Sequence, residues 1–109
     1  MSLMLELMLP ERVEQIFVYL RPVSLRGGAT RFRALCAEGL EREPDEHSAF
    51  LFTNKKRDTL VLFFVDRTGD QTILKKLDSG SFEMPQALGE GAMFAVVPRD
   101  ALPALFRSR

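Results

Sequence analysis

The stretch from Phe52 to Pro85 constrains the fold more than any other part of the chain. It alternates apolar runs of strand length with polar segments that have the composition of turns. These polar segments are residues 54–58 (NKKRD), 66–69 (DRTG) and 78–81 (DSGS). An aspartate at the first position of a turn and a glycine at the last are typical of a hairpin closure. The segment therefore predicts a β-meander.

Apolar, β-branched and aromatic runs predict the strands. They cover residues 15–20, 49–52, 59–65, 71–77 and 93–97, with a further short strand at 82–84. The run at 59–65 is apolar without alternation, which indicates that both of its faces are covered.

Two helices are predicted, one inside the chain and one at its end. Apolar residues recur at helical spacing between residues 29 and 41, at Phe32, Leu35, Cys36 and Leu40. Gly39 lies inside this helix and lowers its propensity, so the last turn is expected to fray or cap there. A second helix is predicted to start at Pro98, because proline is well tolerated in a first turn.

Together these elements predict an α+β fold in one domain, residues 1–109. The fold is a mainly antiparallel β-sheet of about five strands, in the order β-α-β-β-β with a central meander. One helix follows the first strand, and another lies at the C-terminus. The predicted core comprises Ile16, Val18, Phe32, Leu35, Leu51, Leu60, Leu62, Phe64, Leu77, Phe82 and Phe94.

Charge and cysteine content limit the classes of function. Fifteen basic and fifteen acidic residues give a net charge of zero, so only a local patch could favour nucleic acid. The single cysteine, Cys36, excludes an internal disulfide, and with no signal-peptide pattern it favours a cytoplasmic location. The apolar start, residues 1–9, is too short to span a bilayer, so no membrane partner is expected.

No group of residues has the spacing of a catalytic or metal site. Cys36 lies on the apolar face of its helix, which is typical of a core cysteine rather than a nucleophile. His47 lies in an acidic loop that is better interpreted as solvated than as metal-binding. Asp58, Asp66 and Asp78 could supply a DDE-type carboxylate set, but each lies in a turn that favours aspartate. We therefore expect no enzyme activity, no metal and no cofactor.

Basic residues gather at the meander loops and near the start of the first helix. The candidate nucleic-acid-binding residues are Arg26, Lys55, Lys56, Arg57, Lys75 and Lys76. Neighbouring residues of a strand point to opposite faces, so Lys75 and Lys76 cannot both join one patch. One of them, with residues 55–57, could contact phosphates in a salt-sensitive and sequence-independent way. The alternative is a solubilising loop that also protects the edge of the sheet from pairing.

The segment from Phe52 to Pro85 resembles the second-reading-frame accessory protein (TnpB-like) of insertion sequence 66, a bacterial mobile element. The similarity extends over about residues 9–106, and its most specific part lies between residues 57 and 85. There the matching residues are Arg57, Asp58, Leu60, Leu62, Phe64, Asp66, Gly69, Lys75 to Asp78, Gly80, Phe82 and Pro85. Val65 and Met84 stand where the family has tryptophan, so the chain resembles a divergent member.

This resemblance implies a non-catalytic accessory protein of a transposable element. Such a protein is expected to assist DNA transposition by binding nucleic acid. The alternative is a protein–protein adaptor that docks on a transposase or associates with itself. The expected partners are therefore element DNA or a DDE transposase encoded nearby, and the oligomeric state stays open.

Overall fold

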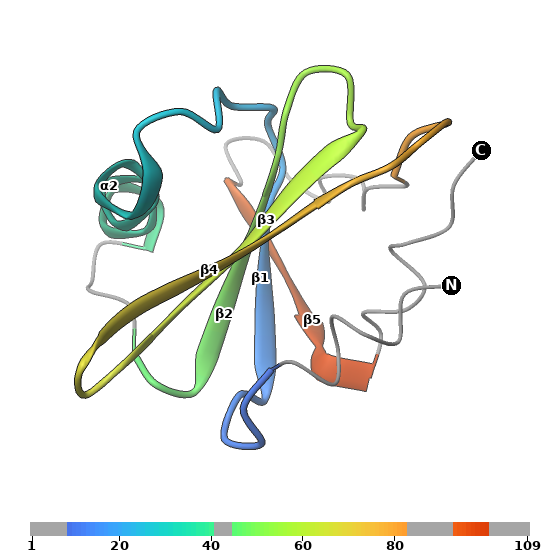
Figure 1. Cartoon of the computed structure of the whole chain (residues 1–109). Helices are drawn as coiled ribbons and strands as arrows, with labels where there is room; N and C mark the ends of the chain where they lie inside the picture. Colours follow the sequence, from blue (N-terminus) through green and yellow to red (C-terminus); the bar gives the residue numbers. More distant parts are fainter. Residues whose placement is uncertain (1–8, 41–44, 83–92, 101–109) are drawn as a thin grey trace.

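The computed structural model describes residues 9–40, 45–82 and 93–100. Within them the chain forms strands and one helix, in an order that Figure 1 shows from β1 to β5. The elements are β1 (Gln15–Tyr19), α2 (Gly28–Leu40), β2 (Ser48–Thr53), β3 (Thr59–Asp66), β4 (Gly69–Lys76) and β5 (Phe94–Pro98). No helix in this part of the chain has the length and apolar character needed to cross a membrane.

The strands form one sheet in the order β4-β3-β2-β1-β5. β1 and β2 run parallel, and α2 supplies the crossover that a parallel pair requires. β2, β3 and β4 form the predicted antiparallel meander, and β5 returns antiparallel to β1. The mainly antiparallel sheet and the helix after the first strand are therefore confirmed.

The chain differs from the prediction at Pro98. This residue ends β5, opposite Gln15 of β1, instead of opening a helix. A 3₁₀ turn begins at Arg99 and Asp100, and the rest of the predicted C-terminal helix lies outside the described residues.

Of the predicted strand at 82–84, only Phe82 is described. It forms an isolated bridge, with its backbone N–H donating to the Arg57 carbonyl at 2.7 Å.

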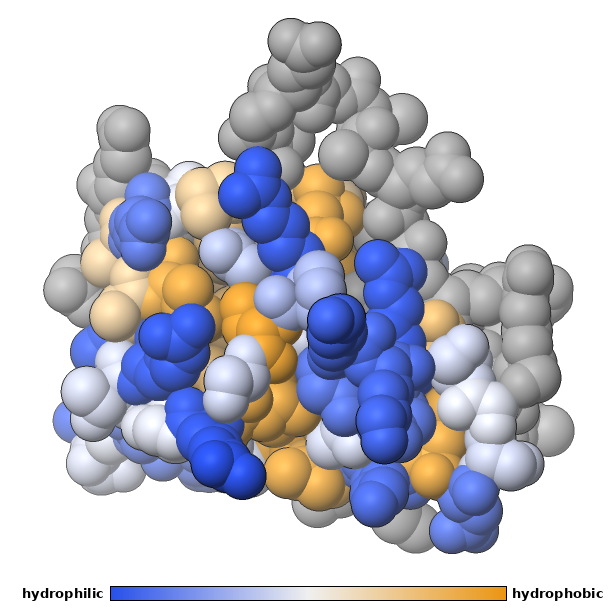
Figure 2. Space-filling model, turned by 90° about the horizontal axis from the view of Figure 1, so that it is seen from above, coloured by the Kyte–Doolittle hydropathy of each residue, from blue (hydrophilic) through white to orange (hydrophobic). Residues whose placement is uncertain are grey.

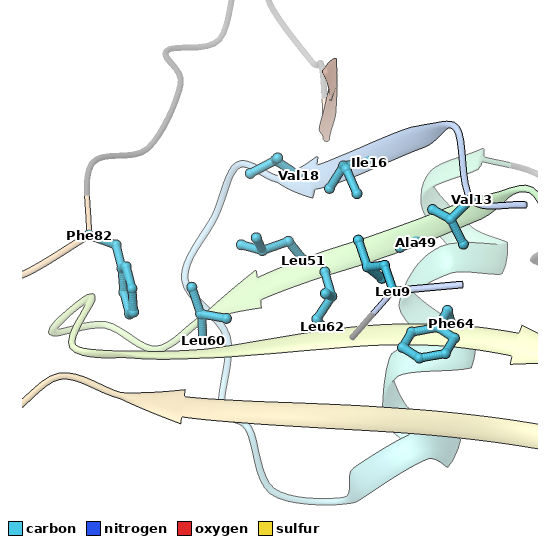
Figure 3. Packing of buried hydrophobic residues seen from close by; sticks show 10 residues of the cluster. All are labelled: Leu9, Val13, Ile16, Val18, Ala49, Leu51, Leu60, Leu62, Phe64 and Phe82. Atoms are coloured by element: carbon cyan, nitrogen blue, oxygen red, sulfur yellow. The ribbon is translucent and has the colours of Figure 1, made fainter. Parts of the chain in front are cut away.

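One face of the sheet carries an aliphatic core, which Figure 3 shows from close by. Alternate residues of β1, β2 and β3 point to this face and are almost completely buried. The segment before β1 also contributes to it. The buried members are Leu9, Val13, Ile16, Val18, Ala49, Leu51, Leu60, Leu62, Phe64 and Phe82.

The other face carries an aromatic core beneath α2. Phe32, Leu35 and Cys36 of the helix pack there with Phe17, Tyr19, Phe50, Phe52, Val61, Phe63 and Val65 of the strands. β3 is therefore buried on both faces, as its uninterrupted apolar run predicted. The predicted core missed most of these aromatic residues. Two of its members, Leu77 and Phe94, are only partly buried.

Gly39 has a role that differs from the predicted capping. The helix continues through it to Leu40. A Cβ atom at this position would lie 2.5 Å from a ring carbon of Phe94. Glycine therefore allows α2 and the Phe94 side chain of β5 to approach closely, and its low helix propensity is offset by this packing.

Candidate nucleic-acid interface

Two loops meet beyond the ends of β1 and β2. Since these strands are parallel, the loops that follow them lie at the same end of the sheet. The Val23 N–H donates to the carbonyl of Thr53, the last residue of β2, at 2.9 Å. Figure 2 looks onto this end, which is at the top of Figure 1, and shows hydrophilic side chains around a strip of apolar ones.

The two loops line an open hollow of about 640 Å³. Its described lining comprises Pro22, Val23, Ser24, Leu25 and Arg26 from the β1–α2 loop, and Asn54 and Lys55 from the β2–β3 loop. Pro22, Val23 and Leu25 supply its apolar lining, and Arg26 and Lys55 supply positive charge. The hollow therefore joins two candidate residues that lie far apart in the sequence.

Asn54 and Asp58 hold the β2–β3 loop closed. The Asn54 side chain donates from Nδ2 to Asp58 Oδ1 at 2.7 Å. Asn54 Oδ1 accepts from the backbone N–H groups of Asp58 and Thr59, each at 3.2 Å. Thr59 Oγ1 also donates to Asp58 Oδ1, at 3.1 Å. The acidic side chain of the loop is thus occupied locally, and the basic residues 55–57 are held on a closed turn.

Arg57 adopts a left-handed backbone conformation with φ of 57°. For a residue with a side chain this conformation costs about 1–2 kcal/mol, whereas glycine adopts it freely. Its carbonyl accepts from the Phe82 N–H, and its own N–H donates to the Asn54 carbonyl at 3.0 Å. An arginine at a position suited to glycine points to a use for the side chain beyond folding.

The predicted basic residues divide between two faces. Arg26, Lys55 and Lys56 are exposed, and Arg57 is partly buried. Lys76 lies opposite Thr59, next to Asp58, and therefore shares the end of the sheet that carries the β2–β3 loop. Lys75 lies opposite Leu60 on the aliphatic face. The structure thus confirms that Lys75 and Lys76 point to opposite faces.

The hollow itself was not predicted, because Pro22, Val23 and Leu25 have no pattern that marks them as the lining of a hollow. Their position depends on the parallel pairing of β1 with β2. Asn54 did carry a usable signal. Asparagine followed four residues later by aspartate, between two apolar runs, favours a loop closed by side-chain hydrogen bonds.

Among the other residues considered for catalysis or metal binding, Asp66 and Cys36 have structural roles. Asp66 Oδ1 accepts from the Thr68 N–H and Oγ1, both at 2.7 Å, and from the Gly69 N–H at 2.9 Å, so it forms the predicted turn. Cys36 is fully buried in the aromatic core, as predicted. His47 is exposed, with Nδ1 3.4 Å from the Arg12 carbonyl. Residues 9–40, 45–82 and 93–100 contain no group of three acidic, histidine or cysteine side chains suited to a metal ion.

Hydrogen bonding lowers the pKa of two turn aspartates. The Asn54 amide is the main cause at Asp58, with smaller contributions from Thr59 and the charge of Lys76. At Asp66 the main causes are the Thr68 hydroxyl and N–H. A carboxyl group whose pKa is lowered by folding stabilises the folded state at pH values above its ordinary pKa. This stabilisation is lost as the pH falls through the pKa that the group has in the folded state.

We therefore expect the free energy of unfolding to decrease as the pH is lowered from about 5 to 2. Asp58→Asn and Asp66→Asn should each make the free energy of unfolding depend less on pH in this range. The double variant should show a still weaker pH dependence. Urea unfolding across this pH range measures the effect. A double variant with the pH dependence of the parent chain would contradict the assignment.

Comparison with family models gives a match to the family described as IS66 Orf2 like protein, over residues 14–105. No curated protein and no solved structure matches the chain. The matched range includes all the strands of the sheet, α2 and both loops of the hollow.

Proposed function

The chain belongs to the IS66 Orf2-like family, and on this premise we propose that it assists DNA transposition by binding the DNA of its element, as a non-catalytic accessory protein of the bacterial cytoplasm. The family itself supports a transposon-associated accessory protein. The observation that carries DNA binding is the meeting of Arg26 and Lys55 at one hollow, beside Lys56 and Arg57.

The electrostatics of this end suit a phosphate backbone. Lys55 and Lys56 are exposed point charges, and Arg26 presents a planar guanidinium that can bind two phosphate oxygens. The one acidic side chain of the β2–β3 loop, Asp58, is engaged by Asn54 and Thr59. With Arg57 included, about four cations could contact phosphates, so affinity should fall steeply with salt.

An adaptor role is the second candidate function. The observation that favours it is the exposure of two large apolar side chains, Leu74 at 62% and Val96 at 53%. They lie on β4 and β5, the two outer strands of the sheet. A transposase or a second copy of the chain could pair with either strand.

A gel-shift titration with terminal-repeat DNA at two salt concentrations tests DNA binding. We expect the double variant Lys55→Glu with Lys56→Glu to lose more than about tenfold in affinity, because two attractive contacts become repulsive. We also expect the affinity of the parent chain to fall with a log–log salt slope of about −4. Absence of binding at low salt, or an unchanged double variant, would refute the proposal.

Two further variants separate binding from folding. Arg67→Glu makes the same charge change as Lys55→Glu, but at the β3–β4 hairpin, and should leave affinity nearly unchanged. Arg57→Gly should weaken binding without loss of stability, because glycine adopts the left-handed conformation at no cost. If Arg57→Gly bound as tightly as the parent chain, Arg57 would have no part in the interface.

A further inference from the structure

β4 is an outer strand with an exposed edge. It has eight residues, it lies at the end of the strand order, and Figure 1 shows it across the front of the molecule. Most of its residues are exposed, and proline is absent from it. β5, at the other end, has five residues and ends in Pro98, which has no N–H to donate. β4 therefore offers the longer ladder for pairing with another strand.

The backbone of β4 determines which of its residues can pair. The Leu77 N–H donates to the Asp58 carbonyl at 2.7 Å, so Leu77 and Asp58 form a hydrogen-bonded pair. Such pairs alternate along an antiparallel ladder. The odd-numbered residues of β4 therefore direct their backbone groups to β3. The even-numbered residues, among them Thr72 and Leu74, direct theirs outward.

We propose that two copies of the chain pair antiparallel through β4, with the twofold axis at Ile73. In this register Asp70 lies opposite Lys76 of the second copy, and the same pair recurs across the axis. Thr72 lies opposite Leu74 of the second copy, and Ile73 lies opposite itself. Thr72 and Leu74 exchange the outward hydrogen bonds, and the two sheets become continuous.

The charges of Asp70 and Lys76 favour this register over the adjacent registers. Opposed residues must share a face, so the axis can pass through Thr72, Ile73 or Leu74. An axis at Leu74 would place Asp70 opposite Asp78, and an axis at Thr72 would place it opposite Leu74. Only the axis at Ile73 opposes Asp70 with Lys76. Lysine on an outer strand commonly prevents pairing, but here it meets a carboxylate of the second copy.

The side chains next to the axis are consistent with this arrangement. Leu74 is 62% exposed and faces the side of the sheet that carries Val61. In the pair it would be covered by Thr72 of the second copy. Ile73 packs against the aliphatic core and would extend that core across the axis. Asp70 also lies 3.4 Å from Arg33, so in the pair it would sit between two cations.

Pairing through β4 does not require DNA, so it is tested by sedimentation of the protein alone. We expect a concentration-dependent dimer, weakened at least tenfold by Leu74→Lys. The matched control is Val96→Lys, the same change at the other exposed apolar residue, on β5, which should leave the dimer unchanged. Asp70→Lys and Lys76→Asp should each weaken the dimer, and their combination should restore it.

Single cysteines report the register directly. Thr72→Cys, Ile73→Cys and Leu74→Cys are oxidised with diamide in separate samples. Ile73→Cys should cross-link fastest, because opposed Cα atoms of a pair without hydrogen bonds are about 4.5 Å apart, within the range of a disulfide. The parent chain is the control, since its Cys36 is fully buried. A monomer at concentrations up to about 100 µM, fastest cross-linking at position 72 or 74, or a Leu74→Lys dimer as strong as the parent would overturn the proposal.

Discussion

Replacing Arg99 with alanine is expected to lower the free energy of unfolding by about 3 kcal/mol or more. Its guanidinium donates to three carbonyls of the segment before β1, those of Leu9 at 2.8 Å, Val13 at 3.1 Å and Pro10. Leu9 and Val13 belong to the aliphatic core, so Arg99 holds part of that core on the sheet. Urea denaturation followed by circular dichroism measures the loss.

Two variants show whether the loss comes from the shape of the guanidinium. Arg99→Lys keeps the charge but replaces the planar fork with a single ammonium group, so we expect an intermediate loss. Arg67→Ala removes an arginine with a 91% exposed side chain, 3.7 Å from Glu46, and should change stability by less than about 0.5 kcal/mol. If Arg99→Ala were as stable as Arg67→Ala, the three hydrogen bonds would contribute nothing measurable.

The meander could be predicted because its signals are local. Asp66 and Gly69 mark their turn by residue type, and the hydrogen bonds of Asp66 follow from those types. The place of β5 beside β1 depends on contacts between residues about eighty positions apart, such as Gln15 and Pro98. No local pattern encodes such a pairing. The same limit explains why Pro98, a favourable start for a helix, instead ends a strand.

The second core was missed for a related reason. β2 and β3 are apolar at nearly every position, so a period of two cannot show which residues face which layer. Most strand residues of the predicted core lie on the aliphatic face. The aromatic face becomes visible only when α2 is placed on it.

The sequence identified the basic residues of the candidate interface, but it did not show which of them lie next to one another. Strand alternation correctly separated Lys75 from Lys76. Nothing in the sequence places Arg26 next to Lys55, because that neighbourhood depends on the parallel pairing of β1 with β2. The parallel pair of β1 and β2 is thus the feature of the fold that assembles the proposed binding site. Val23 and Leu25, which line the hollow, pack against the aromatic core.

Phe52 is the residue of that core whose loss should be most costly. Its ring stacks on Phe32 at 5.0 Å between centroids and also packs against Tyr19 at 5.5 Å and Phe94 at 6.2 Å. The side chain is completely buried. Phe52→Ala should therefore lower the free energy of unfolding by about 3–5 kcal/mol, through lost burial and the cavity that remains. For a domain of this size the Tm should fall by at least about 12 °C.

Phe52→Leu should lose less than half as much free energy of unfolding as Phe52→Ala, since leucine refills much of the cavity. Val96→Ala, an apolar truncation at an exposed site outside the proposed β4 pairing, should leave Tm within about 2 °C of the parent chain. Phe52 also precedes Thr53, whose carbonyl holds the β1–α2 loop through Val23. If Phe52→Ala unfolded no more readily than Val96→Ala, the aromatic core could not be what holds the two loops of the hollow in place.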